Sequence, residues 1–226
     1  MTPDALKRQS ARVAVASVQD GMVLGLGTGS TAAIAVELLA ERVRTGLRVL
    51  GVPTSERTAA QAKALGIPLA DLADHPTLDL TIDGADEVHT GTLDLIKGLG
   101  GALVREKIVA AASRQMIVVV DESKLVSRLG GVRLPVEVVR FGWQATLRHL
   151  EAAGANGKRR NGSDGEPFVS DNGNFIIDCA LDIADPAALD ARLSRIAGVV
   201  ATGLFIGIAT RVIAGTPQGP RILDRA

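Results

Sequence analysis

The sequence has one cysteine, few aromatic residues and no excess of either charge. The lone Cys179 excludes a disulfide within the chain, and the apolar run around it favours a small buried side chain over a nucleophile. The 25 basic residues balance the 25 acidic ones without forming a block, so the charge pattern indicates no binding to nucleic acid or to a membrane surface. No apolar run could span a bilayer, and the first residues do not resemble a leader peptide. We expect a cytoplasmic protein.

Apolar strands alternate with helices in the first half of the chain. With 226 residues, 46% of them hydrophobic, the chain can bury a core as one large α/β domain or as a main domain with a smaller companion. The alternation predicts an α/β fold with a mostly parallel, Rossmann-like sheet that has helices on both faces. The expected strands are residues 22–26, 47–52, 78–83 and 116–120, and the expected helices are 2–18, 32–43, 55–65 and 103–112.

The pattern changes after Lys124 and predicts a second, smaller α+β domain. Its expected elements are a strand at 134–139, a helix at 143–153, a hairpin of 168–170 with 175–181, a helix at 185–196 and a strand at 199–203. This order is close to the split βαβ, ferredoxin-like arrangement, with the basic segment 156–166 as an irregular loop. We expect residues 204–215 to rejoin the first sheet. The predicted domains are therefore 1–127 plus 204–226, the catalytic domain, and 128–203.

A glycine-rich turn, GLGTGST, follows the first expected strand at residues 25–31 and leads into a helix. Backbone N–H groups at a helix start are unpaired and partly positive, so this turn and its hydroxyls can hold a small anion. It is not a dinucleotide motif, because Ser30 replaces the third glycine, and it is not a P-loop, because it has no lysine. Tight packing of the turn is the alternative, and the motif alone leaves both open.

Acidic residues follow the third expected strand, in the segment TIDGADEV. Asp83 stands at the carboxyl end of this strand, where open α/β sheets bind ligands. Capping of the turn is the alternative role for Asp83 and Asp86. Such a group of acids would suit a divalent metal, but the histidines are scattered and no further acidic segment completes a cage, so we expect no metal.

The segments KGLGGALVREK and DESK place further charges next to turns. Lys97 precedes a glycine turn and a helix start, where backbone donors and a positive charge could meet an oxyanion. Glu106 lies on an otherwise apolar face of that helix, and burial there would raise its pKa towards the range of a general base. A surface ion pair with Arg105 or Lys107 is the alternative. Lys124 again stands near a strand end, where a solvated lysine is the usual alternative.

The type A ribose-5-phosphate isomerase family has signature segments that four stretches of this sequence resemble, in the same order: GLGTGSTA, TIDGADEV, KGLGGALVREKIVA and DESK. The resemblance extends to LPVEV, SDNGN and GLFIG, and so covers nearly the whole chain. It implies a two-domain cytoplasmic α/β enzyme, a homodimer or homotetramer, without metal or other cofactor. It makes Glu106 the catalytic proton acceptor and assigns substrate binding to Thr28, Gly29, Ser30, Thr31, Asp83, Gly84, Ala85, Asp86, Lys97, Gly98, Leu99, Gly100 and Lys124. Two departures are Leu99, where the family often has glycine, and a slightly longer segment 156–166.

The implied reaction interconverts D-ribose 5-phosphate and D-ribulose 5-phosphate through an enediolate, a step of the non-oxidative pentose phosphate pathway. Such a reaction needs a carboxylate base and a positive charge near the developing oxyanion, roles that suit Glu106 and Lys97. Asp83 suits ring opening, and Asp86 suits binding of the substrate hydroxyls. The candidates for the phosphate are Ser30, Thr31, Lys124 and Lys7.

Three other functions stay open at this point. A sugar-phosphate sensor would bind the ligand without catalysis, but only about 21 residues precede the first expected strand, too few for a DNA-binding segment. A CoA-transferase-like enzyme would use Glu106 as a covalent nucleophile. A purely structural α/β protein would not need charged residues at several strand ends.

Overall fold

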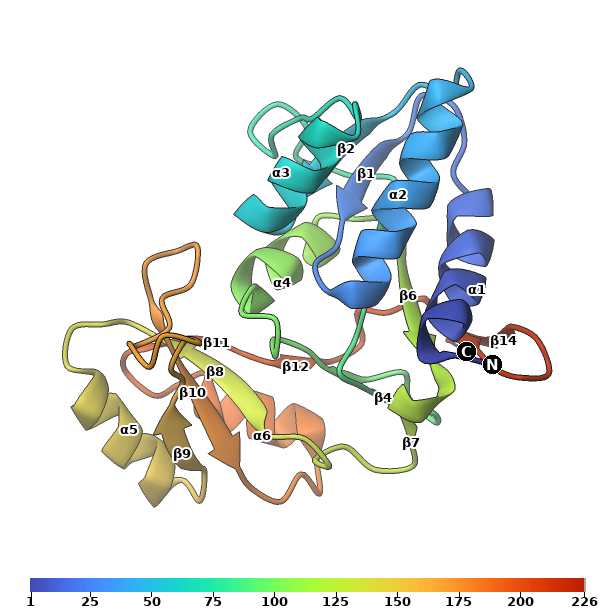
Figure 1. Ribbon diagram of the computed structural model, residues 1–226. Helices are drawn as coiled ribbons and strands as arrows, with labels where there is room; N and C mark the ends of the chain where they lie inside the picture. Colours follow the sequence, from blue (N-terminus) through green and yellow to red (C-terminus); the bar gives the residue numbers. More distant parts are fainter. Residues whose placement is uncertain (226) are drawn as a thin grey trace.

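The computed structural model describes residues 1–225, and Figure 1 shows two lobes that are joined through a middle region. The lobe with α1, α2 and β1 is built on a six-stranded sheet, and the lobe with α5, α6 and β10 is built on a four-stranded sheet. Short strands of a third sheet lie between them. The predicted α/β class is confirmed.

The six-stranded sheet is parallel except at one edge. Its strands lie in the order β14, β13, β6, β3, β1, β2, and only β14 runs antiparallel to its neighbour. Because β2 lies on one side of β1 and β3 on the other, the carboxyl ends of β1 and β3 flank the crevice in which such sheets bind ligands. The bounds are β1 (Val23–Leu26), β2 (Leu50–Pro53), β3 (Leu80–Asp83), β6 (Met116–Asp121), β13 (Arg211–Gly215) and β14 (Arg221–Asp224). The expected return of the closing segment is confirmed by β13, and β14 is an addition.

Both faces of this sheet are covered because its strands are apolar on both. In β6, Ile117 and Val119 pack towards the helices α1 and α2. Val118 and Val120 point the other way and pack on the third sheet. The helix α4 lies on this second face too, through Val109. The bounds are α1 (Pro3–Ala16), α2 (Ser30–Arg44), α3 (Glu56–Ala64) and α4 (Leu103–Ala111).

The four-stranded sheet has the predicted split βαβ order. Its elements follow one another as β8, α5, β9, β10, α6 and β11, and its strands lie side by side as β11, β8, β10, β9, all antiparallel. The bounds are β8 (Leu134–Val138), α5 (Trp143–Ala152), β9 (Asn156–Arg159), β10 (Phe175–Ala180), α6 (Pro186–Leu193) and β11 (Val199–Thr202). The ferredoxin-like expectation is therefore confirmed.

One predicted strand of this sheet is wrong. Residues 168–170 form no strand, and Val169 makes only a single bridge to Phe175. The Gly173 N–H donates to the Ser170 carbonyl at 2.8 Å, which closes a tight turn directly after this bridge. Turn closure therefore replaces the pairing expected there.

β10 pairs with β8 on one side and with β9 on the other, and β9 lies inside the segment 156–166 that the sequence predicts to be a loop. β9 is an edge strand with the charged residues Lys158 and Arg159, so it lacks the apolar alternation that indicates a strand. Gly157 allows it to approach β10, because a Cβ there would lie 2.3 Å from Ile177 Cγ2.

The third sheet joins the other two, with its strands in the order β12, β5, β4, β7. Strands this short produce no periodic pattern, so none is expected from the sequence. The sheet leads directly into Lys97, whose N–H donates to the Gly203 carbonyl at 2.9 Å. The bounds are β4 (Glu87–His89), β5 (Leu95–Ile96), β7 (Leu125–Val126) and β12 (Leu204–Phe205). We propose that the two larger sheets are the cores of the two expected domains, with boundaries near residues 127 and 203.

Two expectations from composition concern the interior and the membrane. Cys179 is fully buried, and burial raises the pKa of its thiol to about 12, which suits a core side chain and not a nucleophile. Within residues 1–225, none of the helices combines the length and the apolar character needed to cross a bilayer.

Candidate active site

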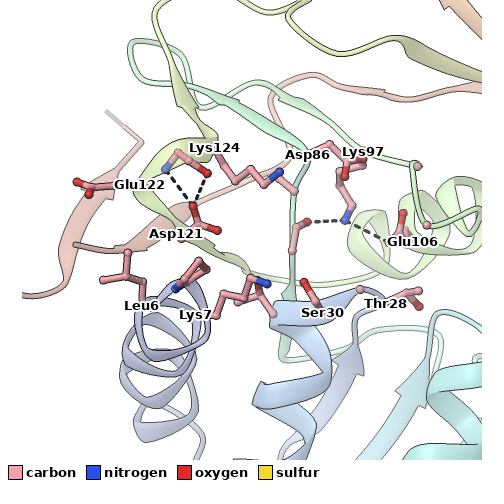
Figure 2. Close-up of a pocket in the computed structure, with 18 of the residues that line it drawn as sticks. Leu6, Lys7, Thr28, Ser30, Asp86, Lys97, Glu106, Asp121, Glu122 and Lys124 are labelled. Carbon is pink, nitrogen blue, oxygen red and sulfur yellow. Dashed lines mark hydrogen bonds and ion pairs between the residues drawn. The ribbon is translucent and has the colours of Figure 1, made fainter. Parts of the chain in front are cut away.

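A cavity of about 440 Å³ lies at the carboxyl ends of the parallel strands, and Figure 2 shows the side chains that line it. Widely separated pieces of the chain meet here, as expected at the point where strand order reverses. The lining residues are Met1, Pro3, Leu6, Lys7, Thr28, Gly29, Ser30, Thr31, Gly84, Ala85, Asp86, Lys97, Gly98, Gly100, Glu106, Asp121, Glu122, Ser123 and Lys124.

Lys97 is the centre of a buried ion cluster in the wall of this cavity. Its Nζ lies 3.0 Å from Asp83 Oδ2 and donates to the Gly84 carbonyl at 2.5 Å. It also lies 3.3 Å from Glu106 Oε1 (Figure 2). Lys97 is 2% exposed, Asp83 0% and Glu106 4%. Glu106 Oε2 is buried and has no hydrogen-bond partner within residues 1–225. A lone pair on this carboxylate is therefore left for a ligand in the cavity.

The helix α4 turns Glu106 inward and its two charged neighbours away from it. Arg105 contacts Glu56 at 2.7 Å, and Lys107 donates to the Leu204 carbonyl at 2.8 Å. Glu106 therefore forms no ion pair with either neighbour, and the burial predicted from its apolar helix face is confirmed.

Burial sets the protonation of this cluster. Removal from water raises the pKa of Glu106 to about 8, although the Lys97 charge acts in the opposite direction. Burial likewise raises the pKa of Asp83, and Lys97 again opposes the shift. For Lys97 itself, burial favours the neutral amine, but the two carboxylates outweigh it and raise the pKa overall. A permanent cation thus faces two carboxyl groups, and the pKa of Glu106 falls near the pH at which a general base works best.

The two aspartates that follow β3 have different surroundings. Asp83 Oδ1 accepts the N–H groups of Thr28 at 3.0 Å and Gly84 at 2.7 Å, so Asp83 ties the first glycine turn to the sheet. It lies behind the lysine and does not line the cavity. Asp86 does line the cavity, and its Oδ2 accepts the Leu99 N–H at 2.9 Å. Asp83 thus holds the cluster together, and Asp86 faces the ligand space.

The start of α2 presents backbone donors to the cavity. Gly29 precedes the helix with a φ of 121°, which glycine adopts easily, and no side chain of residues 1–225 caps the helix. Figure 2 shows the Lys7 ammonium pointing towards Ser30 at this helix start. Positive charge from a lysine and from the helix therefore meets at one end of the cavity.

The second glycine turn, residues 97–101, depends on its glycines. Gly98 has a φ of 107° and Gly101 one of 85°. A Cβ at Gly98 would also lie 2.9 Å from Leu103 Cβ. Leu99, the departure from the family pattern, has no positive φ and is 44% exposed, so its side chain leaves the turn intact.

Several known proteins are similar to this chain in sequence and in fold. The model of the family described as ribose 5-phosphate isomerase A (phosphoriboisomerase A) matches residues 50–219. The chain belongs to the ribose 5-phosphate isomerase A family. The ribose-5-phosphate isomerase A of Gloeobacter violaceus is 59% identical over 99% of this chain and 97% of that protein, and that of Rhodopseudomonas palustris strain BisB18 is 55% identical over the full length of both. The solved structure of ribose 5-phosphate isomerase A from Methanocaldococcus jannaschii, 41% identical, aligns with a TM-score of 0.95 over 99% of this chain and 100% of the other.

Membership in the ribose 5-phosphate isomerase A family confirms the resemblance seen in the four sequence segments, and the chain is an aldose–ketose isomerase. The sensor and CoA-transferase alternatives are not favoured by these matches.

All predicted site residues line the cavity except Asp83, which lies behind it, and Leu99, which points to solvent. The Thr28 hydroxyl is itself engaged with the hydroxyls of Thr54, Ser55 and Thr58. The residues that the sequence did not indicate are Met1, Pro3, Leu6, Asp121, Glu122 and Ser123. The last three belong to the DESK segment, so a strand end rich in charge could have indicated them. The first three have no local signal, because α1 and the residues before it reach the cavity through the packing of α1 on α2, β6 and β13.

Proposed function

We propose that this chain interconverts D-ribose 5-phosphate and D-ribulose 5-phosphate, with Glu106 moving a proton between C2 and C1. The observation that carries the proposal is the buried Glu106 carboxylate, with one oxygen beside Lys97 and the other without a hydrogen-bond partner in the described part of the chain. A solved D-ribose-5-phosphate isomerase, 40% identical with a TM-score of 0.96 over the full length of both chains, is in complex with phospho-erythronic acid, which supports a phosphorylated sugar as the ligand. We also propose a cytoplasmic homodimer or homotetramer that needs no metal.

The proton transfer can be written with residues of the cavity wall. Glu106 takes the C2 proton of the opened aldose, the electrons of that C–H bond form a C1–C2 double bond, and O1 becomes negative. Lys97 and the backbone N–H groups of the adjacent glycine turn stabilise this enediolate. Glu106 then returns the proton to C1, the proton on O2 moves to O1, and the carbonyl forms at C2.

The two aspartates support this step in different ways. Asp86, in the cavity wall, binds substrate hydroxyls. Asp83 holds the Lys97 ammonium at 3.0 Å, so that the charge stays next to Glu106. The ring-opening role expected for Asp83 requires contact with the sugar across Lys97, and it stays a prediction.

The phosphate of the substrate belongs at the start of α2. Ser30 and Thr31 offer backbone N–H groups there, and Lys7 and Lys124 line the same cavity. Lys7→Ala is expected to raise the KM for ribose 5-phosphate about tenfold, because a hydrogen bond to a charged group is lost, with a smaller change in kcat. Steady-state kinetics on the purified variant measures both.

The matched control is Arg8→Ala, the next residue on α1. Arg8 pairs with Glu37 and Glu41 on α2 and does not line the cavity. Its KM is expected to stay unchanged. An unchanged KM in the Lys7 variant as well would remove Lys7 from the phosphate site and leave Lys124 as the cation.

The pH dependence of the reaction reports on Glu106. Because burial raises the pKa of Glu106 to about 8, its reactive ionised form is scarce at neutral pH and increases as the pH rises. We expect kcat/KM to rise with pH and to level off near pH 8. The substrate phosphate also titrates, but its second pKa is about 6, so its effect on the profile falls about two pH units lower. A profile that is already flat above pH 6 would contradict a buried base with a raised pKa.

The overall function is tested by incubating the protein with ribose 5-phosphate and EDTA. Formation of ribulose 5-phosphate is the expected result. Failure of the folded protein to convert the sugar, with or without added divalent cations, would overturn the proposed function. If EDTA stopped the conversion, only the proposal that the enzyme needs no metal would be overturned.

A further inference from the structure

The guanidinium group of Arg160, next to the four-stranded sheet of β8 to β11, binds the second glycine turn of the cavity, residues 97–101. Arg160 follows β9 and places its Nη1 3.0 Å from the Gly98 carbonyl and 3.1 Å from the Leu99 carbonyl. Its Nε donates to Asp178 Oδ2 at 2.9 Å, and its Nη2 donates to Asp178 Oδ1. All three nitrogens of the guanidinium are therefore engaged, and its side chain is only 13% exposed.

The two carbonyls that Arg160 binds fix the direction of the peptide groups behind them. In a trans peptide the N–H points opposite to the C=O. The Gly98 carbonyl points to Arg160, and the N–H of the same peptide, that of Leu99, donates to Asp86 Oδ2. The Leu99 carbonyl also points to Arg160, so the N–H of Gly100, which lines the cavity, points away from the guanidinium. This N–H has no acceptor among residues 1–225.

The turn has one hydrogen bond of its own, from the Gly101 N–H to the Gly98 carbonyl at 3.0 Å, and Arg160 adds an external hold. Three of the four residues from Gly98 to Gly101 are glycines, which restrict backbone rotation least. The small domain also packs Phe168 against Gly101, where a Cβ would lie 2.4 Å from the ring. Hydrogen bonds from the half-buried, charged Arg160 are stronger than neutral ones and set the orientation.

We propose that Arg160 is a positioning residue for the isomerisation: held by Asp178, it orients the turn so that the Gly100 N–H and Asp86 face the sugar at C1 and C2. The proposal rests on the proposed function. It makes the small domain part of the active site, although none of its residues lines the cavity. Arginine suits this role better than lysine because its planar group can bond a carboxylate and two carbonyls at once.

The test compares Arg160→Met, Arg160→Lys and Asp178→Asn with the matched control Arg159→Met. Arg159 is the preceding residue and stacks on Trp143 at 4.8 Å, without contact to the turn. We expect the two Arg160 variants and the Asp178 variant to lose about tenfold or more in kcat, the effect of a lost charged hydrogen bond, with little change in KM. The control is expected to keep its kcat.

Ligand binding separates orientation from general damage. Phospho-erythronate presents a carboxylate where the enediolate oxygens form, whereas inorganic phosphate reaches only the phosphate end. The Arg160 and Asp178 variants are expected to lose affinity for phospho-erythronate in step with kcat/KM and to keep their affinity for inorganic phosphate, both measured by calorimetry. Equal weakening of both ligands, or wild-type kcat in Arg160→Lys, would overturn the proposal.

Misfolding of a variant and failure of the proposed function can each be distinguished from failure of the orienting role. If Arg160→Met does not fold, Asp178→Asn and Arg160→Lys, which keep most of the side-chain volume, decide the question by the same measurements. If the wild-type protein fails to isomerise ribose 5-phosphate, the proposed function fails, and the binding measurements still report whether Arg160 orients the turn. Unchanged phospho-erythronate affinity in all three variants would overturn the orienting role directly.

Discussion

Glu106→Gln is expected to lower the turnover of ribose 5-phosphate by roughly 10²–10⁴-fold, the usual contribution of a general base. The amide matches the carboxylate in shape but cannot take a proton from carbon. Lys97 keeps its ion pair with Asp83 at 3.0 Å, so the cluster retains a carboxylate beside the cation. The loss should therefore fall on kcat and not on KM, as for a group that acts in the transition state. Steady-state kinetics of ribulose 5-phosphate formation measures it.

Glu87→Gln is the matched control for this variant. Glu87 is as buried as Glu106, at 4% exposed, but it accepts the N–H groups of Gly130 at 2.7 Å and Val132 at 2.9 Å, away from the cavity. It is expected to keep its turnover. Exchange of substrate hydrogen with D₂O should disappear in the Glu106 variant and persist in the control. Full turnover by Glu106→Gln would exclude this residue as the base.

The sequence was sufficient for the site residues that stand on regular elements. Glu106 could be found because the other positions on its face of α4 are apolar, which predicted its burial, with a surface ion pair as the alternative. Asp83 could be found because a strand end in a parallel sheet has a known relation to the ligand crevice. Both inferences use only the local spacing of apolar residues and the rule that ligands bind at the carboxyl ends of parallel strands.

The remaining site features depend on approaches between distant segments. Lys7 reaches the cavity because α1 packs beside α2, and Arg160 reaches the Gly98 carbonyl across 62 residues of sequence. β9 is an edge strand with charged residues and lacks an apolar alternation, and the strands of the third sheet are too short to show a periodic pattern of apolar residues. No local pattern encodes these contacts, since they arise from the way the two larger sheets are brought together.

Lys97→Met is expected to lower the free energy of unfolding by about 3–5 kcal/mol at pH 8, because it leaves two buried carboxyl groups without their cation. Lys97 is the group that lowers the pKa of both Asp83 and Glu106, so in its absence both pKa values rise further. A carboxyl with a raised folded pKa stabilises the fold at low pH and loses that contribution as the pH rises through the folded pKa. The deficit should therefore be smaller below pH ~4 and grow towards pH 8. Urea unfolding across this range measures it.

Activity should fall in the same variant by about 10²–10³-fold or more, since a donor to the developing oxyanion is lost. Lys63→Met, on the exposed side of α3, controls for loss of a lysine and should change neither quantity. Asp83→Asn combined with Lys97→Met is expected to recover part of the stability but not the activity, because it removes one unpaired charge and restores no cation. In this double-mutant cycle we expect a coupling energy of about 0.5–3 kcal/mol between Asp83 and Lys97, which measures the contribution of their ion pair to stability. If the loss in Lys97→Met were the same at every pH, lost packing, and not the uncompensated carboxylates, would be its cause.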